Sequence, residues 1–290
     1  MIAVKKYGRN YILINIRWCK GIDKEHQIRW SYSRTTCFEH CPYEYYLQYI
    51  IHDNDLYLSE GNYYAEIGSY VHSIMELIFK KELTVENALT YFENNYDSNV
   101  FYKVKDEIMK NTYNKLYDYF NGLSFPWIKD YDIIGVELKA KFKLYQYDFI
   151  GYIDLLLRDK RDGRLVVLDH KSSAYPFKKD GTVKKSVAHS FYSYKKQMYL
   201  YAHAVHQLYD EFPKEMTWHH FKENGKLATI PFIKQEYDEA MKWFKTTIKK
   251  IEKETDFHAN TDYFYCNNLC NFRNSCEYNK QSKQKWWKKK

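Results

Sequence analysis

The pattern of hydrophobic and polar residues changes its period along the chain, and each change predicts a different element. Over residues 62–81 apolar positions recur every three or four residues, which predicts a helix. Over residues 136–144 they alternate with polar residues, which predicts a strand. Ser31 or Ser33 can cap an earlier helix, in which Pro42 must cause a bend or a restart. The remaining predictions are a short strand over 11–16 and helices over 31–49, 84–96, 101–121, 188–209 and 235–254.

Two segments have the signature of β-hairpins, which are apolar runs joined by a short polar turn. The first spans residues 151–171 and turns at Asp162–Gly163. The second spans residues 216–232 and turns at Asn224–Gly225. The order of elements is therefore helices, three strands, helix, hairpin and helix. It predicts an α/β fold with a mixed β-sheet core flanked by helices, and a helical N-terminal extension.

The first hairpin carries the most informative chemistry. It brings Asp154 close to the end of the partner strand, which reads Asp169-His170-Lys171. Side chains alternate along a strand, so Asp169 and Lys171 share one face while His170 points away. Two carboxylates suit a hard cation such as Mg²⁺, and a nearby amine can stabilise negative charge, as metal-assisted phosphodiester hydrolysis requires. Taken alone, the same residues are more typical of ordinary surface charges on a hairpin.

The composition of the 290-residue chain adds a bias toward an anionic partner. The net charge is +8, the calculated pI is about 8.9, and aromatic residues make up 19%. Basic and aromatic residues together suit nucleic acid, although an AT-rich genome also explains the 31 tyrosines. No apolar run reaches the ~20 residues of a membrane span, and no signal peptide is visible. We therefore expect a cytoplasmic protein without membrane association, in which the six cysteines do not form structural disulfides.

Three closely spaced cysteines near the C-terminus form a second signal. Cys266, Cys270 and Cys276 lie within eleven residues, in a segment expected to be a loop over 262–277. Three thiolates suit a soft or borderline metal, whose fourth ligand must come from elsewhere in the chain. Spacing alone does not separate a zinc site from an iron–sulfur cluster. Cys19 is read as an unrelated free thiol.

Further features surround the first hairpin in a recognisable order. They are a Ser-x-Ser segment followed by Cys41-Pro42, His72 in a helix, Glu137 in the preceding strand, and Gln197 with Tyr201 one helical turn apart. With these motifs, residues 31–278 resemble the RecB-like branch of the PD-(D/E)XK nuclease superfamily. That branch includes the RecB and AddB nuclease domains and the CRISPR-associated RecB-like exonucleases. The resemblance implies a restriction-endonuclease-like fold with a C-terminal cysteine loop.

The resemblance also implies roles for individual residues. Lys171 would be the catalytic lysine, with Glu137 matching the first acidic motif of the family. Gln197 and Tyr201 would match its Q-x-x-x-Y motif, which supports the site and contacts DNA. The Mg²⁺ or Mn²⁺ ligands would be His72, Asp154, Asp169 and the carbonyl of His170. Each residue also has an ordinary reading, as a packed histidine, a helix-surface pair or a strand charge.

For the cysteines, the resemblance implies a [4Fe–4S] cluster held by Cys41, Cys266, Cys270 and Cys276. Such a cluster would join the two ends of the nuclease domain. The spacing from Cys266 to Cys270 is one residue longer than the C-x-x-C usual in this group. Cys37, one helical turn before Cys41, competes for the fourth position. Structural zinc remains the alternative metal.

These observations lead us to expect a metal-dependent deoxyribonuclease, most simply an exonuclease acting on single-stranded DNA or free ends. The alternatives are a structure-specific endonuclease or resolvase on the same fold, and a non-catalytic DNA-binding adaptor. The chain has no phosphate-loop motif, so a helicase or recombination partner would be a separate protein. We expect an N-terminal segment over 1–30, the nuclease domain over 31–278, and a flexible basic arm over 279–290. The gene could be cellular or carried by a phage.

Overall fold

The structure of the chain is a computed structural model that describes residues 2–7, 10–15, 29–51, 62–274 and 276–279. Cys19 and the expected basic arm, apart from Asn279, lie outside the described residues. Near the N-terminus, β1 (Ile2–Tyr7) and β2 (Asn10–Asn15) pair as an antiparallel hairpin. The sequence pattern predicted the second of these strands and missed the first.

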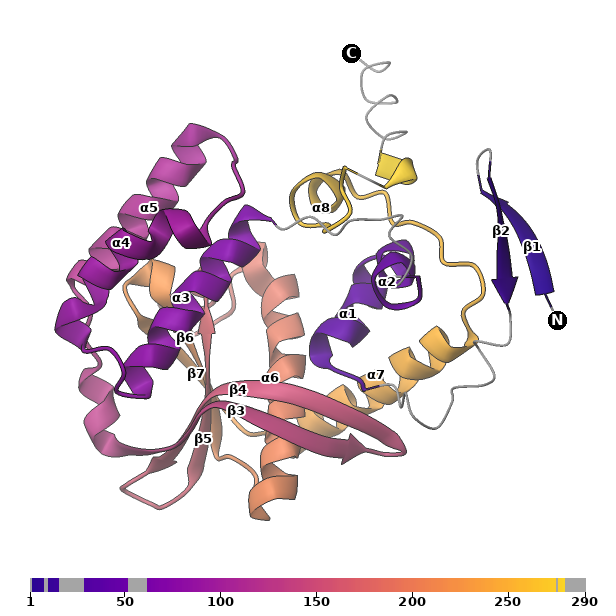
Figure 1. The fold of residues 1–290 in the computed structure, drawn as a ribbon. Coiled ribbons are helices and arrows are strands. Elements are labelled where there is room, and N and C mark those ends of the chain that lie inside the picture. Colours follow the sequence, from indigo (N-terminus) through magenta and orange to yellow (C-terminus); the bar gives the residue numbers. More distant parts are fainter. Residues whose placement is uncertain (1, 8–9, 16–28, 52–61, 275, 280–290) are drawn as a thin grey trace.

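A five-stranded mixed sheet forms the centre of the fold, as the strand patterns predicted (Figure 1). Its strand order is β3-β4-β5-β6-β7, with β5 and β6 parallel and every other pair antiparallel. The connection between β6 and β7 contains a 3₁₀ turn, Phe221–Glu223, and ends at Asn224 and Gly225, whose φ values of 54° and 70° are left-handed. The strands are β3 (Tyr131–Leu144), β4 (Tyr147–Asp159), β5 (Leu165–Lys171), β6 (Glu215–His220) and β7 (Lys226–Pro231).

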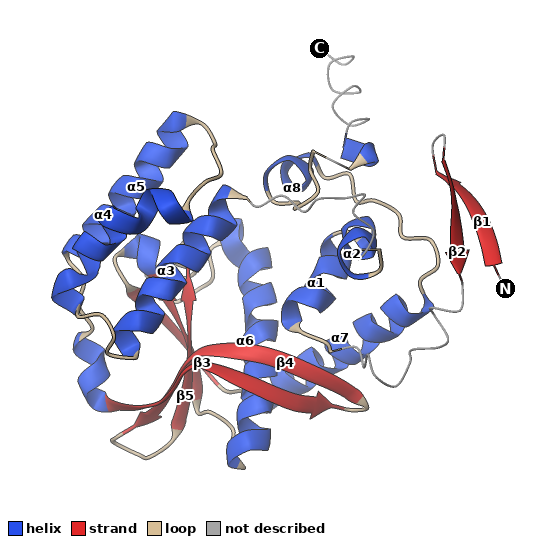
Figure 2. Cartoon of the chain, viewed as in Figure 1, coloured by secondary structure: helices blue, strands red, loops and turns tan. Residues whose placement is uncertain are grey.

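Helices cover both faces of the sheet, and a hydrophobic core lies on each side (Figure 2). On one face, Ile74 of α3 and Phe92 of α4 belong to the same buried cluster as Leu155 of the sheet. On the other, Leu200 of α6 and Phe244 of α7 belong to a second cluster. This arrangement confirms the α/β class. The helices involved are α3 (Tyr63–Phe79), α4 (Ala88–Asn99), α5 (Asp106–Asn121), α6 (Ala188–Tyr209) and α7 (Lys234–Lys253).

The N-terminal helices follow the capping signals in the sequence. Ser31 caps α1 (Tyr32–His40) by accepting a hydrogen bond from the backbone N–H of Arg34 at 3.0 Å. The helix ends at Cys41, and Pro42 starts α2 (Pro42–Tyr49), because proline lacks the N–H that a continuing helix needs.

Several boundaries differ from the predictions. Strand β3 begins at Tyr131 rather than at 136, and β4 begins at Tyr147 rather than at 151. A 3₁₀ turn, Val85–Asn87, precedes α4, so the α-helix starts later than Thr84. Helix α5 starts at Asp106 rather than 101, because the N–H of Tyr102 bonds to Glu66 Oε2 at 2.7 Å and holds the preceding chain outside the helix. The cysteine segment, expected to be a loop, contains the short helix α8 (Tyr263–Asn268), capped by Asp262.

Candidate active site

Neighbouring strands β4 and β5 place the predicted acidic and basic side chains together. The carboxylate of Asp154 on β4 accepts a hydrogen bond from the backbone N–H of His170 at 2.7 Å. On β5, Lys171 Nζ lies 2.6 Å from Asp169 Oδ2. The His170 ring points to the opposite face, where its Nδ1 lies 2.8 Å from Nδ1 of His219. The alternation predicted for this strand is therefore confirmed.

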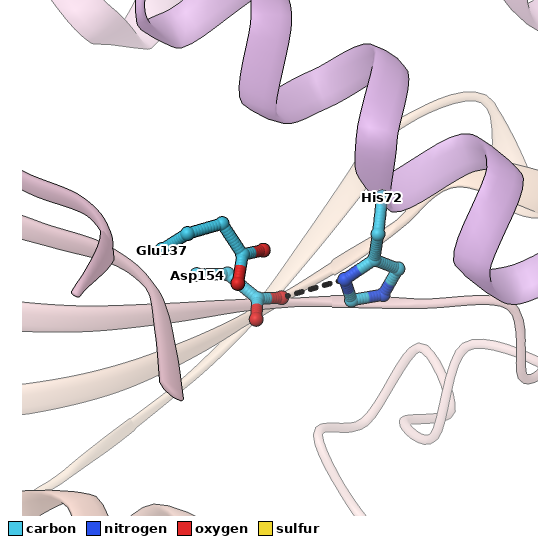
Figure 3. A group of neighbouring side chains, drawn as sticks. All are labelled: His72, Glu137 and Asp154. Atoms are coloured by element: carbon cyan, nitrogen blue, oxygen red, sulfur yellow. Dashed lines mark ion pairs between the residues drawn. The ribbon is translucent and has the colours of Figure 1, made fainter. Parts of the chain in front are cut away.

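A second group of ligand atoms gathers above Asp154 (Figure 3). One ligand atom each from His72, Glu137 and Asp154 lies within 4.8 Å of the others. His72 reaches the sheet from α3, and Glu137 comes from β3, where its backbone has a φ of 46°. That left-handed conformation is uncommon for glutamate and is typical of residues held in place at functional sites.

The hydrogen bonds of His72 define which of its ring nitrogens is free. Nε2 lies 2.9 Å from the carbonyl oxygen of His170, an acceptor, so Nε2 carries the proton. Burial lowers the pKa of His72, which favours the neutral ring. Nδ1 then presents a lone pair 3.3 Å from the Asp154 carboxylate. Either a proton on the Asp154 carboxyl group or a metal cation bound by both atoms would satisfy this contact.

The buried carboxylates have an excess of negative charge. Burial, followed by the charge of Asp169, raises the pKa of Asp154 well above its usual range. Burial, Glu76 and Asp169 likewise raise the pKa of Glu137. Burial alone would lower the pKa of the Lys171 amine. The negative charges of Asp169 and Asp154 have the larger combined effect and raise this pKa.

This donor set fits a hard divalent cation. It combines carboxylate oxygens with an imidazole whose other nitrogen donates to a backbone carbonyl, as is usual for metal-binding histidines. The carbonyl of His170, expected as a metal ligand, is bonded to His72 in the structure.

Helix α6 holds the amine of Lys171 in place. Lys171 Nζ donates to Gln197 Oε1 at 3.0 Å, and Gln197 Nε2 donates to the hydroxyl of Tyr201 at 2.9 Å. The i,i+4 spacing thus places both residues on one helix face, as predicted. Tyr201 is 7% exposed and packs on Gly151, where any Cβ would lie 3.1 Å from its ring.

Two residues near the site escaped the sequence analysis. Lys171 Nζ lies 4.9 Å from the ring centroid of Tyr194, whose position three residues before Gln197 was the available signal. His219 faces His170 because β6 runs parallel to β5 with these residues in register. No sequence pattern could have supplied that pairing.

The predicted cysteine ligands line one pocket between α2 and the C-terminal segment, which lie side by side in Figure 1. Its cysteines are Cys41, Cys266, Cys270 and Cys276. The backbone N–H groups of Glu44 and Asn260 donate to Cys41 Sγ at 3.4 and 3.3 Å.

The competing residue Cys37 does not line this pocket. Its sulfur lies 3.9 Å from Gln48 Oε1. Within the pocket, burial and the neighbouring Cys41 raise the pKa of Cys266 to about 11. The geometry thus brings Cys41, rather than Cys37, to the three C-terminal cysteines.

Comparison with known proteins gives one family and one fold. A family model described as "PD-(D/E)XK nuclease superfamily" matches residues 29–277. No curated protein matches the chain. A crystal structure of a "Putative exonuclease" from Eubacterium rectale is 13% identical, with a TM-score of 0.50, and the match covers 90% of this chain and 93% of that chain. At this identity the likeness shows the fold.

Among the described residues, no helix combines the length and apolar character needed to cross a bilayer.

Proposed function

The chain belongs to the PD-(D/E)XK nuclease superfamily, and we propose that it is a metal-dependent exonuclease of the RecB-like branch that degrades single-stranded DNA from free ends. The observation that carries the proposal is the convergence of Asp154, Asp169 and Lys171 at one end of the sheet, next to His72 and Glu137. A merely structural site would pair its buried charges, whereas here the carboxylates outnumber the one amine.

Mg²⁺ or Mn²⁺, when bound, would lower the pKa of a water molecule and polarise the scissile phosphate. His72, Glu137 and Asp154 would hold the ion, with Asp169 adjacent to them. In this proposal the His170 carbonyl orients His72 by accepting its Nε2 proton.

Lys171 would stabilise the negative charge that develops on the phosphate. Its ammonium group has two fixed partners, Asp169 and Gln197, which hold it at the edge of the carboxylate group. Tyr201 would hold Gln197 in position by accepting the hydrogen bond of its amide. Gln197, the less buried of the two residues, would contact DNA.

The four-cysteine pocket would hold a [4Fe–4S] cluster. The support for this proposal is that Cys41 lines the same pocket as the three C-terminal cysteines, as the resemblance to iron–sulfur members of the branch implies. Structural zinc bound by the same four thiolates is the alternative.

The metal content tests this assignment. Protein purified without oxygen should contain iron and absorb near 400 nm, as iron–thiolate chromophores do. Cys41→Ser should lose the metal, whereas Cys37→Ser should keep it. Colourless protein with stoichiometric zinc would replace the cluster with a structural zinc site. Iron retained in Cys41→Ser and lost in Cys37→Ser would move the fourth ligand to Cys37.

Two DNA substrates test the nuclease itself. End-labelled linear single-stranded DNA should be shortened progressively in Mn²⁺ or Mg²⁺ and should remain intact in EDTA. A circular strand of the same sequence should survive. Cleavage of the circle would identify an endonuclease, and binding without cleavage of either substrate would identify an adaptor. Any unwinding of duplex DNA would require a separate helicase.

A further inference from the structure

A row of basic residues crosses the sheet beside Lys171. Parallel pairing places His220 of β6 opposite Lys171, and antiparallel pairing places Lys226 of β7 opposite His220. Paired residues on adjacent strands project to the same face, so the three side chains form one line. Two strand spacings put the Lys226 backbone about 10 Å from that of Lys171.

Tyr175, in the segment after β5, lies over this row. Its ring centroid is 5.7 Å from that of His220, and 5.8 Å from both Lys226 Nζ and Lys184 Nζ. Two hydrogen bonds fix the segment: Lys184 Nζ donates to the Tyr175 carbonyl, and His220 Nδ1 donates to the Ser173 carbonyl, both at 2.9 Å. The half-buried tyrosine therefore has a defined position, with two lysine amines near its ring.

The two lysines lack an acidic partner in the described part of the chain, unlike Lys195, Lys196 and Lys214, which form ion pairs. The acid nearest in sequence to Lys184, Asp180, is bonded to Thr182 at 2.6 Å. His220 itself is 1% exposed, and its Nε2 has no hydrogen-bond partner among the described residues. A buried polar atom without a partner is costly and is typical of functional sites.

We propose that Tyr175, Lys184 and Lys226, here named the Tyr175 site, bind single-stranded DNA within about two nucleotides of the scissile phosphate. The ring would stack on a base, and the lysines would contact phosphates on either side of it. Bases are free to stack on a side chain only in an unpaired strand, so the site would favour single-stranded over duplex DNA. The proposal rests on the nuclease function proposed above and adds the path that the strand follows.

The fold offers a matched control at its other end. Tyr145, in the turn between β3 and β4, is 48% exposed and has Lys245 Nζ 4.1 Å from its ring centroid. The pair has the same chemistry as the Tyr175 site. It lies seven or more residues along the sheet from Asp154, which at about 3.3 Å per residue exceeds 20 Å.

The test measures binding of fluorescein-labelled oligothymidylate in EDTA, so that no cleavage occurs. Removing two phosphate contacts with Lys184→Gln/Lys226→Gln should reduce the salt slope by about 1.4 and weaken binding about 25-fold at 0.1 M salt. Tyr175→Ala should weaken binding about tenfold, whereas Tyr175→Phe should not. Lys245→Gln and Tyr145→Ala should leave the affinity within twofold of wild type.

Equal losses of DNA affinity in the Lys184/Lys226 and Lys245 variants, or no loss of affinity in either, would overturn the proposal that the Tyr175 site binds DNA. Equal losses on single-stranded and duplex DNA would overturn its strand preference. Failure of the proposed function is distinguishable, because it appears as wild-type protein that does not cleave DNA in Mn²⁺. Melting curves of each variant identify any that fails to fold, and the surface lysine variants keep the test decisive if Tyr175→Ala is one of them.

Discussion

Two aspartates on strand β4 have the same chemistry and opposite surroundings. Asp154 is 7% exposed and Asp159 is fully buried. The carboxylate of Asp159 is held by Arg161 and by Lys214, whose Nζ lies 2.6 Å away. A hydrogen bond from Arg161, together with Lys214, lowers the pKa of Asp159, whereas burial and Asp169 raise the pKa of Asp154.

This difference separates a structural charge from a functional one. Buried charges are tolerated when partners compensate them, and Asp159 has two cationic partners near the turn between β4 and β5. Around Asp154, the carboxylates share the single amine of Lys171. Such an imbalance is typical of sites that bind a cation or carry out proton chemistry.

The largest expected effect is on catalysis. Asp154→Asn keeps the shape of the side chain but removes a metal ligand, and should lower cleavage of single-stranded DNA by about 10³-fold or more. Lys171→Ala and Asp169→Ala should have similar effects. Asp159→Asn should stay within about threefold of wild type, since it contacts no proposed site residue. Cleavage rates at saturating Mn²⁺ measure this, and near wild-type turnover in Asp154→Asn would refute the site assignment.

Metal affinity should depend on His72 and on pH. His72→Ala removes an imidazole ligand, so it should weaken Mn²⁺ binding about 10- to 100-fold. A high Mn²⁺ concentration should partly restore activity by refilling the weakened site. Titration calorimetry measures the affinity. His203→Ala is the control, because that histidine is bonded to Tyr237 and to the Lys143 carbonyl on another part of the sheet.

The pH dependence of metal binding follows from the raised pKa values of Asp154 and Glu137. Metal binds the ionised carboxylates, so the affinity should fall as pH decreases through these raised values. Binding should also release protons at a pH where ordinary carboxylates are already ionised. Affinity that is constant down to pH 5 would place the metal elsewhere.

Stability should change in opposite directions at the two aspartates. Asp159→Asn leaves the charge of Lys214 without full compensation, so it should lower Tm by about 5 °C. Asp154→Asn removes charge repulsion with Asp169, so it should maintain or raise the Tm of the metal-free protein. Because the folded-state pKa of Asp159 is depressed, its contribution is complete above the ordinary carboxyl pKa and is lost as pH falls through the folded-state value. The difference in Tm between wild type and Asp159→Asn should therefore shrink in acid. A lower Tm in both variants would contradict the comparison.

Much of the candidate site could be predicted from the sequence, because local patterns determine it. The β4–β5 hairpin, the shared face of Asp169 and Lys171, and the α6 pair of Gln197 and Tyr201 all follow from strand alternation and helical spacing. The sequence also predicted the second hairpin through its Asn224–Gly225 turn.

What the sequence could not supply was the pairing between distant elements. The second hairpin attaches to the sheet through the parallel pairing of β5 and β6, which follows the long helix α6. Only that pairing places His219 next to His170 and Lys226 in line with Lys171. The same holds for Lys214, one of the two cationic partners of Asp159, because it lies far along the chain, just before β6.

The smallest predicted effect concerns Tyr201, which acts on catalysis only through Gln197. Tyr201→Phe removes the acceptor of the Gln197 amide but keeps the packing on Gly151, so the amide can rotate away from Lys171. The loss of one neutral hydrogen bond, worth about 1 kcal/mol, should lower kcat about fivefold, with a smaller effect on KM through the DNA contact of Gln197. Tyr199→Phe is a control from the same helix, because its hydroxyl donates to Glu236 Oε2 at 2.6 Å on the other side. Equal losses of kcat in the two variants would show a general effect on α6 and would remove Tyr201 from the group that positions Lys171.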